Sequence, residues 1–297
     1  MSAIPFVRDM TFVYGQPDQL TPLIRRVVAR NSGPFTFQGT GVYIIGHGEV
    51  AVIDPGPPID AHLEALKSAL AGERVTHVFT THSHSDHSPL AHPLAQWAGC
   101  KVYGLPDPSG RQHQVSLEEE GEEGFAPDVD VRDGDVFRGA GWTLEALTTP
   151  GHMSNHVCYA LHEENALFSG DHIMGWSTTV ISPPDGNMGD YYRSLEKVHA
   201  RRFATLWPTH GPPVTSVETF IQAYMEHRRA REATILARLR AGDTQIPDMV
   251  RTIYKDVDAR LHPAAARSVL AHMIYLVECG HVAADGPVTL SARYRPS

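Results

Sequence analysis

Short apolar segments alternate with helix-like segments along the first two-thirds of the chain. Two apolar runs, 41–46 and 50–54, are separated by turn residues and predict a β-hairpin. The leucines of 60–70 recur at helical spacing, which predicts a helix with Asp60 as its N-cap. Further strands are predicted at 75–80, 101–103, 142–149, 157–161, 166–169 and 204–207, and further helices at 90–98 and 191–200. This pattern is typical of an α/β protein whose strands pair in both directions.

The pattern changes after residue 216. It then predicts one long helix over 217–240 and two shorter helices over 247–254 and 264–278. A β-hairpin is predicted between Val282 and the segment 288–290. Three helices followed by a small hairpin is the order of a winged helix. We therefore expect two domains, 1–216 and 217–297.

Charge is unevenly divided between these parts. The chain has a net charge of −9, but residues 217–297 hold 11 Lys+Arg and 9 Asp+Glu, which leaves 14 and 25 in residues 1–216. The first part, at −11, should repel polyanions unless bound cations offset its charge. The acidic stretch 118–123 is expected to be a solvated loop.

Cysteine usage and hydropathy indicate a cytoplasmic protein. Cys100, Cys158 and Cys279 are odd in number and form no CxxC pair, so a disulfide framework is not expected. No apolar run approaches the roughly 20 residues of a membrane-spanning helix, and 1–11 does not resemble a secretory leader. We expect no membrane partner.

The strongest chemical signal is a histidine cluster after the predicted strand 75–80. The segment reads His82-Ser-His84-Ser-Asp86-His87 in a chain with 18 histidines. Residues i and i+2 at a strand end face the same side, so His82 and His84 can bind one ion while Asp86 and His87 face a second. The probability of such a cluster by chance is on the order of 0.004 for this composition.

Three other predicted strand ends carry a possible metal ligand. His152 follows the strand that ends at Thr149, Asp171 follows 166–169, and His210 follows 204–207. Each of these three residues is weak evidence for a metal site when taken alone, because a single histidine after a strand is usually an ordinary loop residue. Together they predict a site at one edge of a β-structure.

In order, these motifs resemble the metallo-β-lactamase superfamily over residues of about 40–215. The resemblance implies an α+β fold, the αββα sandwich, with two metal ions. It assigns the first metal to His82, His84 and His152, the second to Asp86, His87 and His210, and Asp171 as a bridge between them. Asp54, in Ile53-Asp54-Pro55-Gly56, resembles the early aspartate of the family, which supports the site without ligating.

The ligand set indicates the chemistry. Five imidazoles and two carboxylates suit two Zn²⁺ ions, and they would also accept Mn²⁺ or Fe²⁺. The resemblance implies a metal-bridging hydroxide as the nucleophile, with Asp86 and Asp171 as the catalytic carboxylates. His156 and His172 are candidates for supporting contacts to the ligands or the substrate. No cysteine occupies a ligand position, which argues against β-lactam hydrolysis.

A finer resemblance is to the β-lactamase-like 2 group, which includes a single-stranded RNA endoribonuclease and polyketide thioesterases. It is carried by 170–179, 183–186, the 262–264 segment that opens the last helix, and the winged-helix-like C-terminal part. Ser88-Pro89 departs from the Gly-Gly that is common in the superfamily at this place. This departure would reshape the start of the following helix.

Three functions are compatible with these motifs. The first is hydrolysis of a small thioester, ester or lactone; the second is cleavage of single-stranded RNA; the third is a non-catalytic winged-helix binding protein with a structural metal domain. The complete ligand set disfavours the third, and a pI of about 6.0 disfavours RNA. The basic cluster Arg228, Arg229 and Arg231 is flanked by glutamates, so we expect the C-terminal domain to cover the active site or to form a homodimer.

Overall fold

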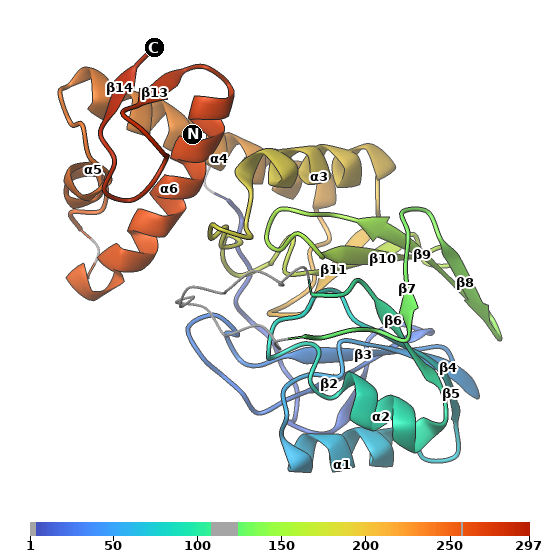
Figure 1. The fold of residues 1–297 in the computed structure, drawn as a ribbon. Helices are drawn as coiled ribbons and strands as arrows, with labels where there is room; N and C mark the ends of the chain where they lie inside the picture. Colours follow the sequence, from blue (N-terminus) through green and yellow to red (C-terminus); the bar gives the residue numbers. More distant parts are fainter. Residues whose placement is uncertain (1–3, 108–123, 257) are drawn as a thin grey trace.

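Two β-sheets face each other in the computed structural model, which describes residues 4–107, 124–256 and 258–297 (Figure 1). The first sheet has seven strands in chain order, β1(Pro17–Gln19), β2(Ile24–Val28), β3(Gly41–Ile45), β4(Glu49–Ile53), β5(Arg74–Phe79), β6(Lys101–Gly104) and β7(Val129–Asp130). Neighbours from β1 to β4 are antiparallel, and those from β4 to β7 are parallel. The acidic stretch 118–123 lies outside the described residues.

The second sheet has five strands in the order β12(Thr205–Pro208), β11(Ala166–Gly170), β10(Val157–Leu161), β9(Trp142–Thr148) and β8(Val136–Gly139). Its strands are antiparallel except for the parallel pair β11 and β12. Both sheets therefore bring several strand ends to a common edge, and strands pair in both directions as predicted.

The alternating direction of side chains along the strands explains why helices cover the outer face of each sheet while the inner faces pack together. In β3, Val42 and Ile44 pack with the apolar faces of α1(Asp60–Ala69) and α2(Ala91–Ala98), while Tyr43 and Ile45 pack between the sheets. Side chains of a strand point alternately to opposite faces, so a strand with apolar residues on both must be covered on both. On the other side, α3(Met188–Arg201) covers the second sheet (Figure 1). The result is the predicted αββα sandwich.

The helix α4(Val217–Arg240) serves two hydrophobic cores. Near its start, Phe220 and Tyr224 pack into the core beneath α3, whereas Ile235 and Leu239 near its end pack into a separate C-terminal core. That core is completed by α5(Ile246–Ile253), α6(His262–Glu278), β13(Val282–Ala284) and β14(Tyr294–Pro296), with a 3₁₀ turn at Ala259–Leu261. The expected boundary at residue 216 thus falls where a helix shared by both cores begins.

Several local predictions were wrong. The N-cap of α1 is Ile59, and Asp60 is the first helical residue, where its charge still favours the helix N-terminus. β13 pairs with β14 rather than with 288–290, because Tyr294 is buried in the C-terminal core while Leu290 is exposed. Strands β1, β2, β7 and β8 were not predicted.

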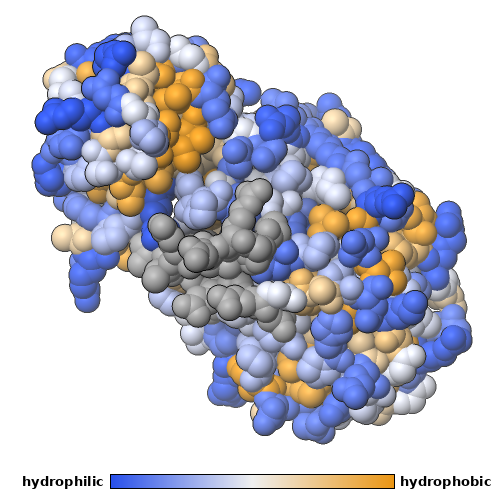
Figure 2. Space-filling view, in the orientation of Figure 1, coloured by the Kyte–Doolittle hydropathy of each residue, from blue (hydrophilic) through white to orange (hydrophobic). Residues whose placement is uncertain are grey.

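All three cysteines carry free thiols. Among the helices of the described residues, none is both long and apolar enough to span a bilayer. On the face shown in Figure 2, hydrophilic residues cover most of the described surface, and a hydrophobic patch lies on the C-terminal helical part.

Candidate metal centre

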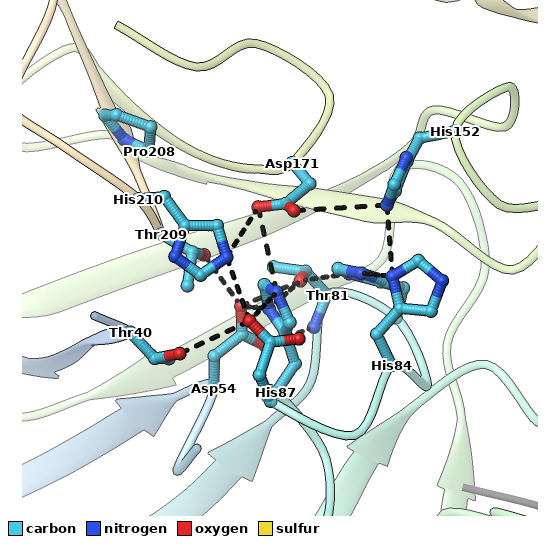
Figure 3. Close-up of polar contacts among 12 residues, drawn as sticks. Thr40, Asp54, Thr81, His84, His87, His152, Asp171, Pro208, Thr209 and His210 are labelled. Carbon is cyan, nitrogen blue, oxygen red and sulfur yellow. Dashed lines mark hydrogen bonds and ion pairs between the residues drawn. The ribbon is translucent and has the colours of Figure 1, made fainter. Parts of the chain in front are cut away.

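Polar side chains from several strand ends converge at one edge of the sandwich (Figure 3). Each follows a strand directly or after a short turn, which explains why distant sequence segments meet there. The convergent residues are Asp54 after β4, His82, His84, Asp86 and His87 after β5, His152 after β9, Asp171 after β11 and His210 after β12.

Three imidazoles form the first group. The Nδ1 atom of His84 lies 2.9 Å from Nε2 of His82 and 3.2 Å from Nε2 of His152. Burial, with the neighbouring imidazoles adding to it, lowers the pKa of His82 well below its usual value. The pKa of His84 falls to about 3, again chiefly because of burial. Neutral rings present lone pairs, so His82 and His84 are in the protonation state that binds a cation.

The second group contains one carboxylate. The Oδ2 atom of Asp86 lies 2.9 Å from Nε2 of His210 and 3.4 Å from Nε2 of His87. Burial raises the pKa of Asp86, but the charge of His87 and the hydrogen bond from His210 outweigh it and hold this pKa well below its usual value. Although burial lowers the pKa of His87, the charges of Asp86, Asp54 and Asp171 raise it well above normal. A positive charge is therefore stabilised here.

Asp171 lies between the two groups and faces both. Its Oδ1 atom is 3.5 Å from Nε2 of His210 and 3.7 Å from Nε2 of His87, while its Oδ2 atom is 4.0 Å from Nε2 of His152. Each oxygen is thus directed at a different group. A carboxylate in this position has the geometry of a bridge between two cations.

The donor atoms fit divalent cations. His87 Nε2 and Asp171 Oδ1 are buried, point toward each other and have no hydrogen-bond partner among the described residues. Leaving such atoms unpaired costs free energy unless another group satisfies them. Imidazoles with a minority of carboxylates are the donor set that Zn²⁺ and similar ions prefer.

Asp54 positions neighbouring residues of the site through hydrogen bonds but is not itself one of the candidate ligands. Fully buried, it accepts hydrogen bonds from the Thr81 backbone N–H (2.7 Å) and hydroxyl (2.8 Å), from the Thr209 hydroxyl (2.9 Å) and from Nδ1–H of His87 (2.8 Å). The bond to His87 directs the Nε2 lone pair of that ring toward the centre. The φ angle of Asp54 is +49°, a conformation that aspartate tolerates better than most residues.

Backbone carbonyls fix two other ligand rings. His152 Nδ1 donates to the carbonyl of Val180 at 2.8 Å, and His210 Nδ1 donates to the carbonyl of Gly39 at 3.2 Å. Each bond engages Nδ1, so Nε2 is the ring atom left to bind a cation. Thr40 adds a hydroxyl that donates to Asp86 Oδ2 at 3.3 Å.

Gly39, Thr40 and Val180 were not identified from the sequence. A backbone carbonyl leaves no residue-type signature, and Thr40 lies in a loop without a metal-ligand pattern.

His156 and His172 have different positions. His156 Nε2 accepts a hydrogen bond from the Asp171 backbone N–H at 3.2 Å, and its Nδ1 pairs with the Thr149 hydroxyl at 2.9 Å. It therefore holds the segment that carries Asp171. The His172 ring packs against Tyr191 instead, and neither of its nitrogens has a hydrogen-bond partner among the described residues. The structure does not bring this ring to a ligand.

A cavity of about 190 Å³ opens onto the metal groups. Its floor is formed by His84, Asp86, His152, Asp171 and His210. Its walls are largely apolar and include Phe35, Met174, Trp176 and Val180. Such a cavity suits a small apolar substrate with one polar reacting group.

Two known protein families match this chain, one over the sandwich with its metal-site candidates and one over the C-terminal part. Residues 35–210 match the metallo-beta-lactamase superfamily, and residues 246–287 match the beta-lactamase associated winged helix domain. The chain belongs to the metallo-β-lactamase superfamily, as its motifs predicted, and is a hydrolase of that fold with a C-terminal winged-helix domain. The matched regions lie on either side of residue 216, and that boundary stays a prediction.

Two curated relatives illustrate the range of similar proteins. The chain is 30% identical over 279 residues to the atrochrysone carboxyl ACP thioesterase AgnL7 of Paecilomyces divaricatus, covering 90% of this chain and 83% of the relative. It is 30% identical over 261 residues to the beta-lactamase-like protein 2 homolog of Caenorhabditis elegans, covering 85% and 83%.

A solved structure shares the fold over nearly the whole chain. The beta-lactamase domain protein from Burkholderia ambifaria superposes with a TM-score of 0.79 at 19% identity, covering 97% of this chain and 96% of that protein.

Proposed function

We propose that this protein is a binuclear metal-dependent hydrolase that cleaves a small thioester, with esters and lactones as further substrates of the same kind. The observation that carries the proposal is the position of Asp171, whose two carboxylate oxygens face two separate groups of candidate ligands, nearly all of them buried. A site for one structural ion would not need this arrangement.

The residues have separable roles in the proposed reaction. Two Zn²⁺ ions, or Mn²⁺ or Fe²⁺ in their place, would activate a water molecule and polarise the scissile carbonyl. Asp86 and Asp171 line the cavity and are kept ionised by the histidines around them, so their carboxylates could hold the cations and accept hydrogen bonds that orient the attacking water. The apolar walls at Met174 and Trp176 exclude bulk water from the reacting carbonyl.

Three observations support a thioester substrate. The curated relative that matches 90% of the chain is named a thioesterase. The cavity over the ligands is small and mainly apolar, which fits an acyl group. The net charge of −9 disfavours a polyanionic substrate.

The competing proposal, cleavage of single-stranded RNA, would use the same metal groups on a phosphodiester. A substrate panel separates the two: an acyl thioester, a lactone, a β-lactam, a simple phosphodiester and a single-stranded RNA. We expect the thioester to be cleaved fastest. RNA cleavage at low enzyme concentration that Asp171→Asn abolishes would overturn the thioester proposal.

Metal content tests the binuclear site directly. We expect close to two metal ions per chain by elemental analysis, and His84→Ala or Asp86→Ala should lose metal and activity together. His92→Ala, at an exposed position of α2, is the matched control and should change neither. A wild-type protein that folds without metal and is indifferent to chelators would contradict the proposal.

A further inference from the structure

A second, larger cavity adjoins the one over the metal groups. Its volume is about 720 Å³, and it shares four lining residues with the smaller cavity, Phe35, Ser177, Thr178 and Val180. The opposite wall comes from the C-terminal helices α4 and α6 and the turn before α6. A ligand can therefore extend from the metal groups toward the C-terminal domain.

The larger cavity is basic, although the whole chain has a net charge of −9. Its cationic or protonatable lining residues are Arg8, Arg228, Arg231, Arg267, His227 and His272. No aspartate or glutamate is among the described residues that line it. Glu232, which does not line the cavity, is hydrogen-bonded to Tyr192 and to the lining residue His272.

Arg228 is the most informative of these residues. Its side chain lies over the Tyr191 ring, 5.2 Å from the centroid, and donates to the Thr179 carbonyl. The residue is only 4% exposed, its Nε has no hydrogen-bond partner, and no carboxylate of the described residues lies within ion-pair distance. A buried charge is costly unless an opposite charge compensates it, so this guanidinium lacks an anion.

Two side chains near Arg228, those of His227 and Arg231, are also consistent with an anion-binding position in this cavity. His227 Nδ1 is buried without a hydrogen-bond partner. Burial, and to a smaller extent the charges of Arg228 and Arg231, lowers the pKa of His227 to about 4. Arg231 stacks over the Tyr254 ring at 4.5 Å and is held at the cavity wall.

One loop connects this basic cavity to the metal groups. Arg228 donates to the carbonyl of Thr179, and the metal-ligand candidate His152 donates to the carbonyl of Val180, the next residue. The loop thus separates a reacting end from an anion-binding end. A substrate that occupies both must carry its negative charge away from the scissile bond.

We propose that the larger cavity binds a phosphate group on the thiol half of the substrate. Guanidinium groups donate paired hydrogen bonds to phosphate, and several of them match a charge of up to −2. The substrate class is then a thioester of a phosphorylated thiol, in which a phosphopantetheine arm is joined either to a nucleotide, as in coenzyme A, or to a carrier protein. This rests on the proposed thioester hydrolysis.

Binding measurements test the phosphate subsite without catalysis. We expect calorimetry of the wild-type protein to show phosphopantetheine binding at least about ten-fold more tightly than pantetheine. Arg231→Gln should remove most of that difference and Arg231→Lys should keep part of it, because the charge remains. Arg229→Gln, on the same helix but exposed and outside the lining, should leave it unchanged. Equal binding of the two thiols by wild-type protein would overturn the proposal.

Kinetic measurements then separate the sources of the phosphate from the reaction itself. Faster cleavage of acyl-phosphopantetheine than of acyl-pantetheine supports the subsite, and comparison of acyl-coenzyme A with an acyl carrier protein shows which source is used. Arginine-dependent phosphopantetheine binding without thioester cleavage supports the subsite and rejects the proposed reaction. A single-stranded RNA that displaces phosphopantetheine and is cleaved would overturn the assignment to a phosphorylated thiol.

Discussion

His87 donates a hydrogen bond from Nδ1 to the buried carboxylate of Asp54 at 2.8 Å, on the side of the ring opposite the metal position. We expect Asp54→Asn to lower metal affinity by about 10- to 100-fold, because the ring loses the carboxylate that orients it and raises its basicity. Asparagine also tolerates the φ of +49° at this position, so the backbone should be preserved. Competition with a fluorescent chelator measures the affinity, with Asp9→Asn at an exposed position as the control.

Metal removal should lower thermal stability. The ligands are assembled only in the folded chain, so an ion that binds this state alone stabilises it by about 2.7 kcal/mol at a free concentration 100 times its Kd. We expect a chelator to lower the melting temperature of the wild-type protein but not that of His84→Ala. Equal shifts in the two proteins would show that the chelator acts elsewhere.

Glycine is required immediately before Asp171. Gly170 has a φ of +52°, and a Cβ there would lie 2.6 Å from Nε2 of His156 and 2.9 Å from Cβ of Thr81. We expect Gly170→Ala to displace Asp171 and to reduce metal binding in an equilibrium titration. Gly72→Ala is the matched control, since its φ is +83° but nothing lies within 4 Å; it should cost about 1 kcal/mol of stability and leave metal binding intact.

Stability should fall in mild acid partly because of His62. Burial lowers its pKa to about 4 from 6.5, despite a hydrogen bond to the Pro55 backbone. The unfolded chain therefore binds the proton more readily, so the stabilisation is complete above pH 6.5 and is lost as the pH falls toward 4, by up to about 3 kcal/mol. Denaturant unfolding at several pH values should show a smaller decline between pH 6.5 and 4 for His62→Gln. A parallel decline in the two proteins would contradict the assignment.

The start of α4 should stabilise the sandwich. Phe220 is 2% exposed and packs edge-on against Phe6 with ring centroids 6.2 Å apart. We expect Phe220→Ala to cost about 3–5 kcal/mol in denaturant unfolding of the catalytic part, because it leaves a cavity in that core. Val13→Ala, at a side chain 66% exposed, should change stability by no more than about 0.5 kcal/mol.

The convergence of the candidate metal-binding residues could be predicted because their sequence signals are local. The cluster after β5 is contiguous, and His152, Asp171 and His210 each follow an apolar strand segment, so strand-end geometry alone indicates that they meet. His156 was identifiable as a histidine near this motif, but its contact with the Asp171 backbone was not.

Long-range features could not be predicted. The strand β2 contains two adjacent arginines, Arg25 and Arg26, which break the apolar pattern that predicts a strand. Arg26 is nevertheless buried and forms an ion pair with Asp18. The spacing in α4 predicted a helix but not that its two ends join different cores. The burial of Arg228 likewise depends on how the helices pack, and the residues near it in the sequence do not reveal that packing.

The larger cavity has one wall from the sandwich and the other from α4 and α6. Every proposed metal ligand lies outside those helices. On the proposed substrate assignment, substitutions in the C-terminal helices would change substrate preference while the reaction chemistry is preserved. Exchange of α6 side chains between relatives would then be a route to new specificities that leaves the reactive centre untouched.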